Sequence, residues 1–345
     1  MNFIRVILVP ISLLYSVIIF FRNLFYDKGI LQSHKISVPV ISVGNISTGG
    51  TGKTPLVILI SEYLLEKGRK IGIISRGYKR KSESALTVYD GIELKCGIDL
   101  SGDELMLIYE NLINKFEGGF YIIASSDRYE ASKIMMDNFS PDLIILDDGF
   151  QHRKIKRDLD IVLMDASDYQ SKIFLRSFLL PSGNLRESIS GLSRADLIIQ
   201  NNKSDNFREL NFLNDFDKPV YKLTYKTEFY MDNKNRILHK TGCSVIAFSG
   251  IANDDSFIDM ISKDGHFVKE RLTFPDHHNY CERDFELLIS KFTEGMIYVT
   301  TEKDFVKIKN ISGFADKYPV YFLKLKTEIS ENSNSFFEKI NTLTN

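Results

Sequence analysis

The sequence predicts an α/β fold, in which a mostly parallel sheet of the P-loop NTPase type carries helices on both faces. A smaller α/β C-terminal lobe and an N-terminal membrane-associated helix complete the prediction. Between Val38 and Gln200 short apolar runs alternate with helical patterns, as in successive βαβ units. One of these runs leads directly into a glycine-rich loop, and the chain begins with a long apolar segment.

The N-terminal segment, residues 1–25, is expected to contact a membrane. From Phe3 to Phe21 nearly every residue is apolar, and about nineteen helical residues at ~1.5 Å each approach the ~30 Å hydrocarbon core of a bilayer. No small-residue cleavage site follows, so a secretory signal is not indicated. If the helix spans, the flanking Arg22, Lys28 and Lys35 place the body of the protein in the cytoplasm.

Polar residues interrupt this segment at regular intervals. Arg5, Ser12, Ser16 and Asn23 fall along one narrow stripe of a helix. Such a stripe suits a helix that lies in the membrane interface, or one that spans with this seam against protein. A hairpin of buried core helices divided at Pro10 remains the alternative, because length alone does not separate core from membrane helices.

The next element, Val38 to Val43, is a buried strand that leads into Ser47-Thr-Gly-Gly-Thr-Gly-Lys-Thr54. Freed backbone N–H groups in such a loop cradle a polyphosphate at the start of a helix. Ser47 stands where the G-x-x-x-x-G-K-[ST] pattern has its first glycine, and Thr48 stands where partition ATPases have a signature lysine. A nucleotide site is therefore expected, with ATP and Mg²⁺ held by the following residues: Gly49, Gly50, Thr51, Gly52, Lys53 and Thr54.

Two carboxylates end a later apolar strand, Ile144-Ile-Leu-Asp-Asp-Gly149. This is the arrangement of a Walker B element, in which Asp147 holds or orients Mg²⁺ near the phosphate loop. An Asp-Gly turn that only ends the strand is the simpler interpretation of the same residues.

Further along the chain two segments suit proton transfer or anion binding. Asp103 opens a helix, where it serves either as a cap or as the carboxylate that accepts a hydroxyl proton. Pro275-Asp-His-His-Asn-Tyr280 places two histidines beside an acid, which suits base chemistry better than a zinc site and also suits a surface turn. Three segments are candidates for binding an anionic group on an acceptor: the basic run Ser75–Ser82, Arg128 and the pair Arg186-Glu187.

A GTPase is the rival interpretation. Asn202-Lys-Ser-Asp205 follows an apolar strand and matches the NKxD element that reads guanine, but the accompanying D-x-x-G element is missing. A nucleotide-switched membrane adaptor is the non-enzymatic alternative.

After Pro219 the sequence becomes polar and rich in turn residues, which indicates a second lobe. We expect a P-loop kinase domain at 26–220 and a smaller lobe at 221–345, with strands at Val245–Phe248, Met296–Thr300 and Val320–Leu323. A net charge of -1 excludes a broadly basic nucleic-acid binder. The three scattered cysteines suggest neither a disulfide framework nor a zinc site.

Together these segments resemble the tetraacyldisaccharide 4'-kinase family, which phosphorylates a lipid A precursor. The resemblance spans nearly the whole chain and rests on ordered motifs: Gly49–Pro55, Ser75-Arg-Gly-Tyr78, Gly102-Asp-Glu104, Asp127-Arg128, Asp147-Asp-Gly-Phe-Gln-His152 with Arg157-Asp158, Leu180-Pro-Ser-Gly183 with Leu185-Arg-Glu187, Gly250-Ile-Ala-Asn253, Asp276-His-His278 and Thr301-Glu-Lys-Asp304. Where the family commonly has L-P-A-G-P-L-R-E, this chain has Ser182 and Asn184.

The resemblance implies ATP-dependent phosphorylation of the 4'-hydroxyl of a tetraacylated glucosamine disaccharide 1-phosphate, a glycolipid, to form lipid IVA. It implies location at the cytoplasmic face of a bacterial inner membrane and no nucleic-acid partner. Asp103 would be the catalytic carboxylate, paired with His277 or, alternatively, His278. Lys53, Thr54, Asp147 and Asp148 would hold nucleotide and Mg²⁺. The acceptor would be bound by Arg76, Tyr78, Arg128, His152, Arg186 and Glu187.

Overall fold

The computed structural model describes residues 3–77, 84–166, 178–202, 209–252, 254–309, 311 and 313–344. The chain forms two compact units. Unit 1 comprises Met1–Thr224 and Glu328–Asn345, and unit 2 comprises Tyr225–Thr327. Two long strands, β8 (Val220–Asp232) and β12 (Val320–Ile329), carry the chain from one unit to the other.

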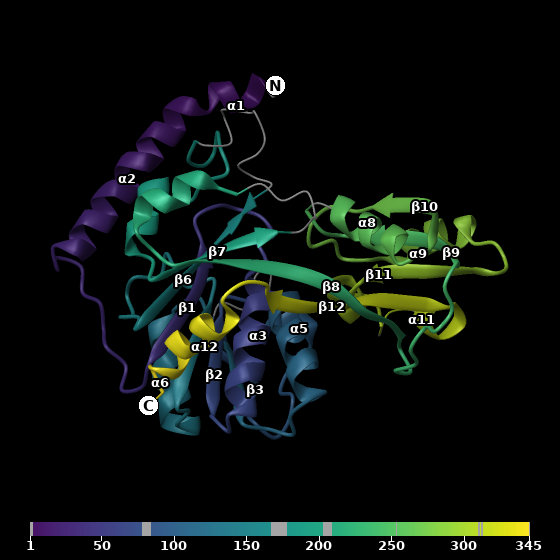
Figure 1. The fold of residues 1–345 in the computed structure, drawn as a ribbon, viewed down its shortest axis with the longest axis horizontal. Helices are drawn as coiled ribbons and strands as arrows, with labels where there is room; N and C mark the ends of the chain where they lie inside the picture. Colours follow the sequence, from purple (N-terminus) through teal and green to yellow (C-terminus); the bar gives the residue numbers. More distant parts are fainter. Residues whose placement is uncertain are drawn as a thin grey trace. The chain divides into compact units, whose positions relative to one another are not determined.

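Unit 1 contains the sheet that the sequence predicted (Figure 1). Its strand order is β8-β7-β6-β1-β5-β2-β4-β3, and every neighbouring pair is parallel except β3 with β4. The described elements in chain order are α1 (Phe3–Ile7), α2 (Val9–Asp27), β1 (Val40–Asn45), α3 (Lys53–Glu66), β2 (Ile71–Ser75), β3 (Leu86–Tyr89), α4 (Ile98–Ser101), α5 (Asp103–Ile113), β4 (Phe120–Ala124), α6 (Arg128–Phe139), β5 (Leu143–Asp147), β6 (Leu159–Asp165), η2 (Ile189–Arg194), β7 (Leu197–Asn202), η3 (Asn211–Phe216) and α12 (Ser333–Asn341).

Side chains of this sheet are buried on both faces, as a parallel sheet covered by helices requires. Val40, Ile74 and Ile144 pack with Ala131 and Met135 of α6. The alternate strand positions are fully buried as well, and α3 lies against β1, β2 and β5. The α/β fold with a mostly parallel sheet is therefore confirmed.

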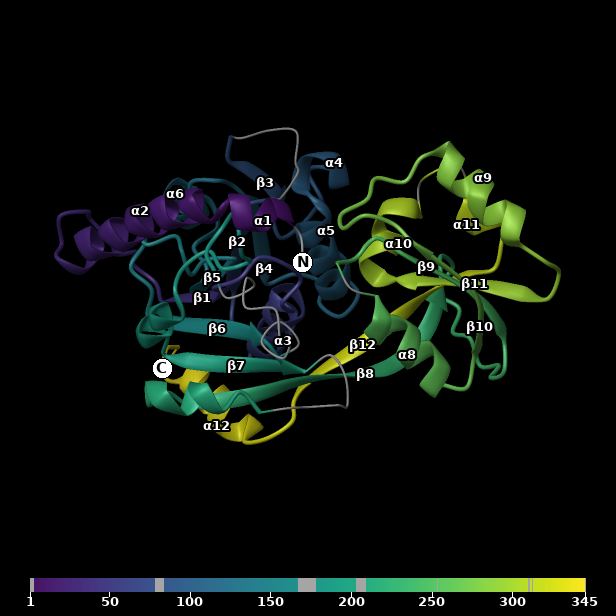
Figure 2. The same ribbon diagram turned by 90° about the horizontal axis from the view of Figure 1, so that it is seen from above.

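The strand order places β1 at a topological switch point. From β1 the chain proceeds to β2 on one side, with β5 between them, whereas β6 lies on the other side of β1 (Figure 2). Ligands of open α/β sheets bind outside the carboxyl ends of the strands at such a point. The glycine-rich loop after β1 occupies this position.

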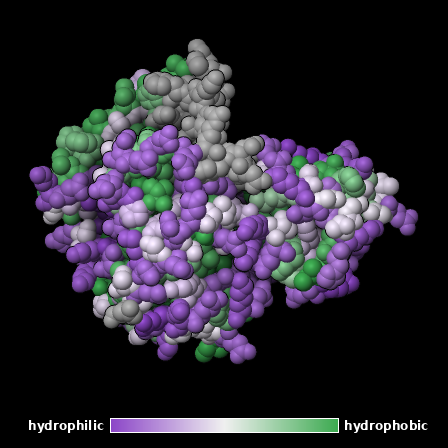
Figure 3. Space-filling model, in the orientation of Figure 1, coloured by the Kyte–Doolittle hydropathy of each residue, from purple (hydrophilic) through white to green (hydrophobic). Residues whose placement is uncertain are grey.

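Helix α2 lies on the surface of unit 1 rather than in its core. Only Ser12 is buried in this helix, so the alternative of a buried helical hairpin is wrong. Pro10 sits in the first turn of α2, where no backbone donor is needed, and does not divide it. Helix α2 is long and apolar enough to cross a membrane, and hydrophobic surface gathers along it at the upper left of Figure 3.

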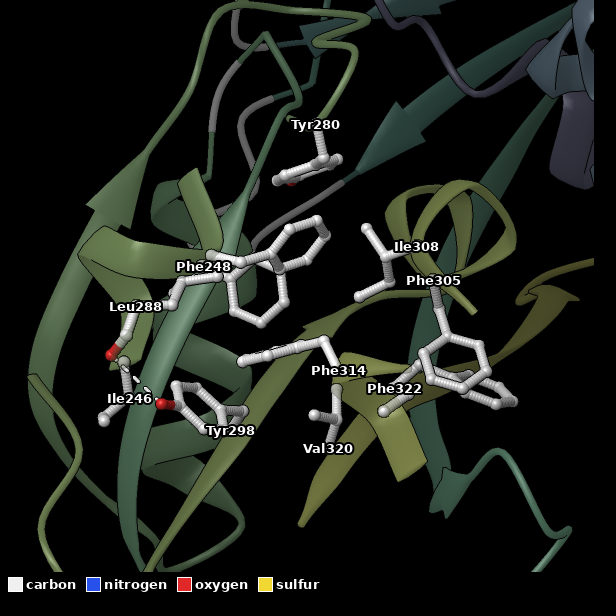
Figure 4. Close-up of a cluster of buried hydrophobic side chains, with 12 residues drawn as sticks. Ile246, Phe248, Tyr280, Leu288, Tyr298, Phe305, Ile308, Phe314, Val320 and Phe322 are labelled. Atoms are coloured by element: carbon white, nitrogen blue, oxygen red, sulfur yellow. Dashed lines mark hydrogen bonds between the residues drawn. The ribbon is translucent and has the colours of Figure 1, made fainter. Parts of the chain in front are cut away.

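Unit 2 is a smaller α/β unit with the strand order β10-β9-β11-β12-β8, where the pairs β10–β9, β9–β11 and β11–β12 are parallel. Aromatic side chains fill its core, and the Tyr298 hydroxyl donates to the Leu288 carbonyl at 3.0 Å (Figure 4). Its described elements are β9 (Ser244–Ser249), α8 (Asp255–Lys263), β10 (Phe267–Thr273), α9 (Glu282–Lys291), β11 (Met296–Thr301), α10 (Glu302–Ile308) and α11 (Phe314–Lys317).

The observed units differ from the predicted lobes at the C-terminus. We expected 221–345 to form one lobe, but Glu328–Asn345 belongs to unit 1. Helix α12 returns there because Phe337 stacks on Tyr63 of α3 at 4.2 Å and Asn341 Nδ2 donates to the Tyr63 hydroxyl at 2.6 Å.

Candidate functional site

The loop between β1 and α3 has the backbone of a phosphate-binding loop. Gly49 and Gly52 adopt φ values of 111° and 87°, a region that strongly favours glycine. Two amides, one on β1 and one on β7, hold the loop: Asn45 Nδ2 donates to Thr51 Oγ1, and Asn201 Nδ2 donates to the Thr51 carbonyl, both at 2.7 Å. Lys53 therefore begins α3 at the carboxyl end of the sheet, with the helix N-terminus directed at the loop.

Asp148 links the lysine of this loop to an arginine. Lys53 Nζ lies 3.4 Å from Asp148 Oδ1, and Arg186 Nη1 lies 2.8 Å from both Asp148 oxygens. Burial by itself would raise the pKa of Asp148, but Lys53 and Arg186 lower it to about 2. The carboxylate is thus ionised at neutral pH and holds two cations at the loop.

Asp147, at the end of β5, has a raised rather than a lowered pKa. It pairs in register with Val43 of β1, and only 1% of it is exposed. Neither of its carboxylate oxygens has a hydrogen-bond partner among the described residues. Burial, followed by the nearby charge of Glu104, raises the pKa of Asp147 to about 7.

A divalent cation fits this environment. Mg²⁺ in nucleotide sites takes one or two carboxylates together with phosphate oxygens, and the unpartnered oxygens of Asp147 are ligands of that type. Thr54, in the first turn of α3, supplies the hydroxyl that the loop pattern assigns to Mg²⁺. Within the described ranges no cluster of three or more His, Cys, Asp or Glu side chains could hold a metal without phosphate oxygens.

Cations surround the two aspartates. Arg128 is 6% exposed and interacts electrostatically with Asp147, Asp148, Arg76 and Arg186. Burial lowers the pKa of Arg128, yet an arginine remains protonated in proteins. Its Nε has no hydrogen-bond partner among the described residues, so this buried guanidinium retains a donor for an anionic ligand.

His152 lies beside Arg128. Burial, and next the charge of Arg128, lower the pKa of His152 to about 4. The imidazole is neutral at pH 7, and its Nε2 has no partner within the part of the chain that the structure describes. A neutral imidazole of this kind is suited to a hydrogen bond with a sugar hydroxyl.

Glu187 is fixed by a network rather than left open. Its carboxylate accepts from Gln151 Nε2 at 2.8 Å and from Arg194 Nη2 at 2.5 Å. Asn23 of α2 lies 3.5 Å from the same group. Glu187 is 2% exposed, so it acts here chiefly by shaping the segment that carries Arg186.

Asp103 opens α5, directly after Gly102, which has a φ of 85°. The side chain is 8% exposed. The next residue, Glu104, is close enough to Asp147 to raise its pKa. The start of α5 therefore lies near the end of β5, on the same side of the sheet as the nucleotide loop.

In unit 2 the two adjacent histidines have different surroundings. His278 Nε2 lies 2.8 Å from Asp284 Oδ2, and its ring stacks on Phe274 at 4.8 Å. His277 Nε2 lies 3.2 Å from Lys303 Nζ, and the backbone of His277 has a φ of 56°. Such a left-handed conformation is unfavourable for most residues other than glycine and is often retained at functional positions.

The structure thus groups most of the predicted residues. In unit 1, direct contacts or electrostatic interactions join Lys53, Asp147, Asp148, Arg76, Arg128, His152 and Arg186. His277 and His278 belong to unit 2. Tyr78 lies outside the described residues, as do residues 203–205 of the NKxD-like element.

Comparison with known proteins is consistent with this geometry. A model of the tetraacyldisaccharide-1-P 4'-kinase family matches residues 4–345. The chain belongs to this family. A tetraacyldisaccharide 4'-kinase of Aquifex aeolicus (strain VF5) is 37% identical over 339 residues, which are 96% of this chain and 98% of the relative. One from Pelodictyon phaeoclathratiforme is 34% identical over 348 residues, covering 96% and 95% of the two chains.

A solved family structure is similar as well. The crystal structure of the "apo" form of LpxK from Aquifex aeolicus in complex with ATP superposes with a TM-score of 0.79 at 36% identity, covering 99% of this chain and 100% of the other. These findings confirm the family resemblance and the fold class. They do not favour the GTPase or adaptor alternatives.

Sequence reasoning missed several residues that support the site. Gln151 donates to the Asn45 carbonyl at 2.7 Å as well as to Glu187, and Asn201 holds the nucleotide loop from β7. Asn201 comes two residues after the apolar run Leu197–Ile199, and that position at a strand's carboxyl end was the available signal. For Gln151 only its place two residues after the Asp-Asp-Gly turn gave an indication.

Proposed function

We propose that this protein transfers the γ-phosphoryl group of ATP to the 4'-hydroxyl of a tetraacylated glucosamine disaccharide 1-phosphate, a step of lipid A biosynthesis. The observation that carries the proposal is the arrangement of Lys53, Asp148 and Arg186 beside the unpartnered carboxylate of Asp147. This arrangement lies at the switch point of the sheet, in a chain that the kinase family model matches from residue 4 to residue 345.

The residues of the loop hold the nucleotide in this proposal. Backbone N–H groups of residues 49–54 and the N-terminus of α3 bind the phosphates, and Lys53 neutralises charge on the transferred group. Thr54, Asp147 and Asp148 would hold Mg²⁺, which supplies further charge neutralisation when bound. Since Asp148 already holds Lys53 and Arg186, we assign Asp147 the larger part of that role.

Proton transfer is assigned to Asp103 and His277. A carboxylate within reach of the acceptor hydroxyl orients it and accepts its proton as the bond to phosphorus forms. The left-handed backbone of His277 supports its selection over His278. Both rings have partners, Lys303 for His277, and Asp284 and Phe274 for His278.

Binding of the acceptor is assigned to Arg76, Tyr78, Arg128, His152 and Arg186, and to Glu187 through the segment that it holds in place. The guanidinium groups would attract the anionic acceptor, and the neutral imidazole of His152 would bind a hydroxyl. Arg128 and His152 support this role most directly because each keeps an unpartnered buried nitrogen.

The acceptor is a lipid, and α1 and α2 offer a surface for its membrane. Large apolar side chains on these helices are between 39% and 63% exposed, namely Val6, Ile7, Ile11, Leu13, Leu14, Val17, Ile18, Phe20, Phe21 and Phe25. Burying such a face in a bilayer interface is favourable. The basic residues that follow α2 favour the cytoplasmic face of the inner membrane.

One assay tests the proposal. Labelled ATP, Mg²⁺ and the tetraacyl disaccharide 1-phosphate in mixed micelles should give a labelled glycolipid on thin-layer chromatography. Lys53→Ala should abolish most of this product, whereas Lys133→Ala, which removes a lysine of an exposed pair on α6, should not. No labelled lipid from the wild-type protein, or full turnover by Lys53→Ala, would refute the assignment.

A further inference from the structure

The segment 182–187 has two partners in unit 1: the N-terminal helices on one side and the nucleotide loop on the other. The residues that contact it from the N-terminal side are Arg5 of α1 and three residues of α2. We call these four the N-terminal seam: Arg5, Ser12, Tyr15 and Asn23.

The contact with the N-terminal seam is made of specific polar pairs. Ser12 Oγ donates to Ser182 Oγ at 2.7 Å and accepts from the Ser182 N–H at 2.9 Å. Both serines are at most 2% exposed. Arg5 Nη2 donates to Asn184 Oδ1 at 3.3 Å, and the Tyr15 hydroxyl donates to the Arg186 carbonyl at 3.1 Å. Ser182 and Asn184 are the two positions where this chain departs from the motif of its family.

On its other side the same segment pairs with the nucleotide loop through backbone groups. The Thr48 N–H donates to the Asn184 carbonyl, and the Arg186 N–H donates to the Ile46 carbonyl, both at 2.7 Å. Ser47 and Leu185 form an antiparallel bridge between these two bonds. Ser47, which replaces the first glycine of the loop pattern, is thus held by an isolated β-bridge to segment 182–187.

The side chain of Arg186 extends the connection to the phosphate-binding lysine. Arg186 contacts Asp148, and Asp148 contacts Lys53. The Tyr15 hydroxyl holds the Arg186 carbonyl, so a continuous set of contacts runs from α2 to the lysine of the loop. These contacts couple α2 to the nucleotide loop only if loss of the seam contacts also changes the geometry of the loop.

We propose that the N-terminal seam positions the nucleotide loop, so that the affinity for Mg-ATP depends on the docking of α2 against segment 182–187. Ser12 and Tyr15 are positioning residues in this scheme, because their side chains bond to the segment and act through it. The inference deepens the proposed kinase function and rests on the loop being its nucleotide site. The helix that offers a surface to the lipid would then also set the affinity for the nucleotide.

By thermodynamic linkage, the coupling between nucleotide binding and the docking of α2 is reciprocal. If docked α2 strengthens nucleotide binding, then bound nucleotide must strengthen the docking of α2 by the same factor. Mg-ATP should therefore slow hydrogen exchange of the amides of α2. This readout requires neither turnover nor an acceptor.

The experiment compares two serines four residues apart on α2. Ser12→Val removes the buried hydroxyl that Ser182 needs, and Ser12→Thr keeps it. Ser16→Val is the matched control, because Ser16 Oγ bonds only to the Leu13 carbonyl of its own helix among the described residues. The Kd for Mg-ATP is measured by titration without acceptor. Ser12→Val loses both buried hydrogen bonds to Ser182 and should raise this Kd about fivefold or more, while Ser12→Thr and Ser16→Val keep the wild-type value.

A second variant covers the case in which Ser12→Val does not fold. Tyr15→Phe deletes one hydroxyl at constant shape and should raise the Kd for Mg-ATP about threefold or more. Wild-type Kd values in folded Ser12→Val and Tyr15→Phe would overturn the inference, as would equal shifts in Ser12→Val and Ser16→Val. If nucleotide binding shifts as expected but no glycolipid is labelled, the proposed acceptor fails and the positioning role stands.

Discussion

Replacing Asp148 by asparagine tests the ion-pair network at the nucleotide loop. In the native protein this carboxylate lies between Lys53 and Arg186, and its pKa is lowered to about 2 from an ordinary value of 3.8. That difference corresponds to about 2 kcal/mol of stability, an upper value because 24% of the side chain is exposed to screening solvent. Asp148→Asn should lower the unfolding temperature at pH 7 by roughly 5 °C.

The pH dependence has a defined sign. Because the folded pKa of Asp148 is depressed, its stabilisation is present above the unfolded value near 3.8 and is lost as the pH falls toward 2. The part of the difference in unfolding temperature between wild type and Asp148→Asn that comes from Asp148 itself should therefore shrink below pH 4. Phosphoryl transfer should fall about 10²-fold, since Lys53 and Arg186 lose the charge that orients them.

The assay is thermal unfolding followed by circular dichroism, together with glycolipid labelling. Glu130→Gln is the matched control: it breaks an exposed pair with Lys133 at 2.8 Å, which contributes at most about 1 kcal/mol. Equal unfolding temperatures for Asp148→Asn and wild type, with unchanged turnover, would refute the network. A loss of the same size in Glu130→Gln would show that the effect is not specific to the site.

Three further predictions concern other parts of the protein. Between pH 6.5 and 4 the unfolded chain binds a proton at His152 that the folded protein excludes. As the pH falls through this range, urea unfolding should show a loss of up to about 3 kcal/mol in the free energy of unfolding. An equal loss in His152→Asn would show that His152 is not its source. Asp103→Asn and His277→Gln should each lower kcat by about 10²-fold or more with the Kd for Mg-ATP unchanged, and near-wild-type kcat in either would remove that residue from proton transfer. Leu14→Glu and Phe20→Glu, at side chains that are both 63% exposed, should reduce sedimentation with anionic vesicles while leaving the unfolding temperature unchanged. Undiminished sedimentation would exclude this face of α2 as the membrane-binding surface.

Strands β1, β2, β4, β5, β6 and β7 could be predicted because they are buried on both faces and therefore largely apolar. Strands β3 and β8, which have half-buried or exposed positions, were not predicted. The run Ile71–Ile74 corresponds to β2, and Leu143–Leu146 corresponds to β5. Strands with one exposed face gave no such signal. In β10, exposed and half-buried positions alternate and the residues include Lys269, Glu270 and Arg271, as expected of an edge strand protected by charge.

The nucleotide part of the candidate site could be predicted because its residues follow strands. Parallel strands bring their carboxyl ends to one edge of the sheet, so Lys53 after β1 and Asp147 at the end of β5 had to lie close together. Sequence alone could not show that the pKa values of two adjacent aspartates shift in opposite directions. Burial raises the pKa of Asp147, whereas the contacts of Asp148 with Lys53 and Arg186 outweigh burial and lower its pKa.

Contacts between distant segments could not be predicted. Ser12 and Ser182 are 170 positions apart, and Tyr63 and Asn341 are 278 apart. The polar stripe on the N-terminal segment left open whether that face lies in the membrane interface or meets protein. The contacts of Arg5, Ser12 and Asn23 show that it meets protein. It did not indicate which segment that face meets, because a stripe specifies a direction and no partner.

The central claim is transfer of phosphate to a single hydroxyl of a glycolipid, and the position of the new phosphate tests it most directly. Wild-type protein is incubated with Mg-ATP and tetraacyl disaccharide 1-phosphate, and the product is examined by mass spectrometry and by ³¹P and ¹H NMR. We expect one new phosphomonoester, at the 4' position, with one ADP formed for each phosphate transferred. ADP without a new phosphomonoester, a phosphate at another hydroxyl, or transfer from GTP in preference to ATP would contradict the account.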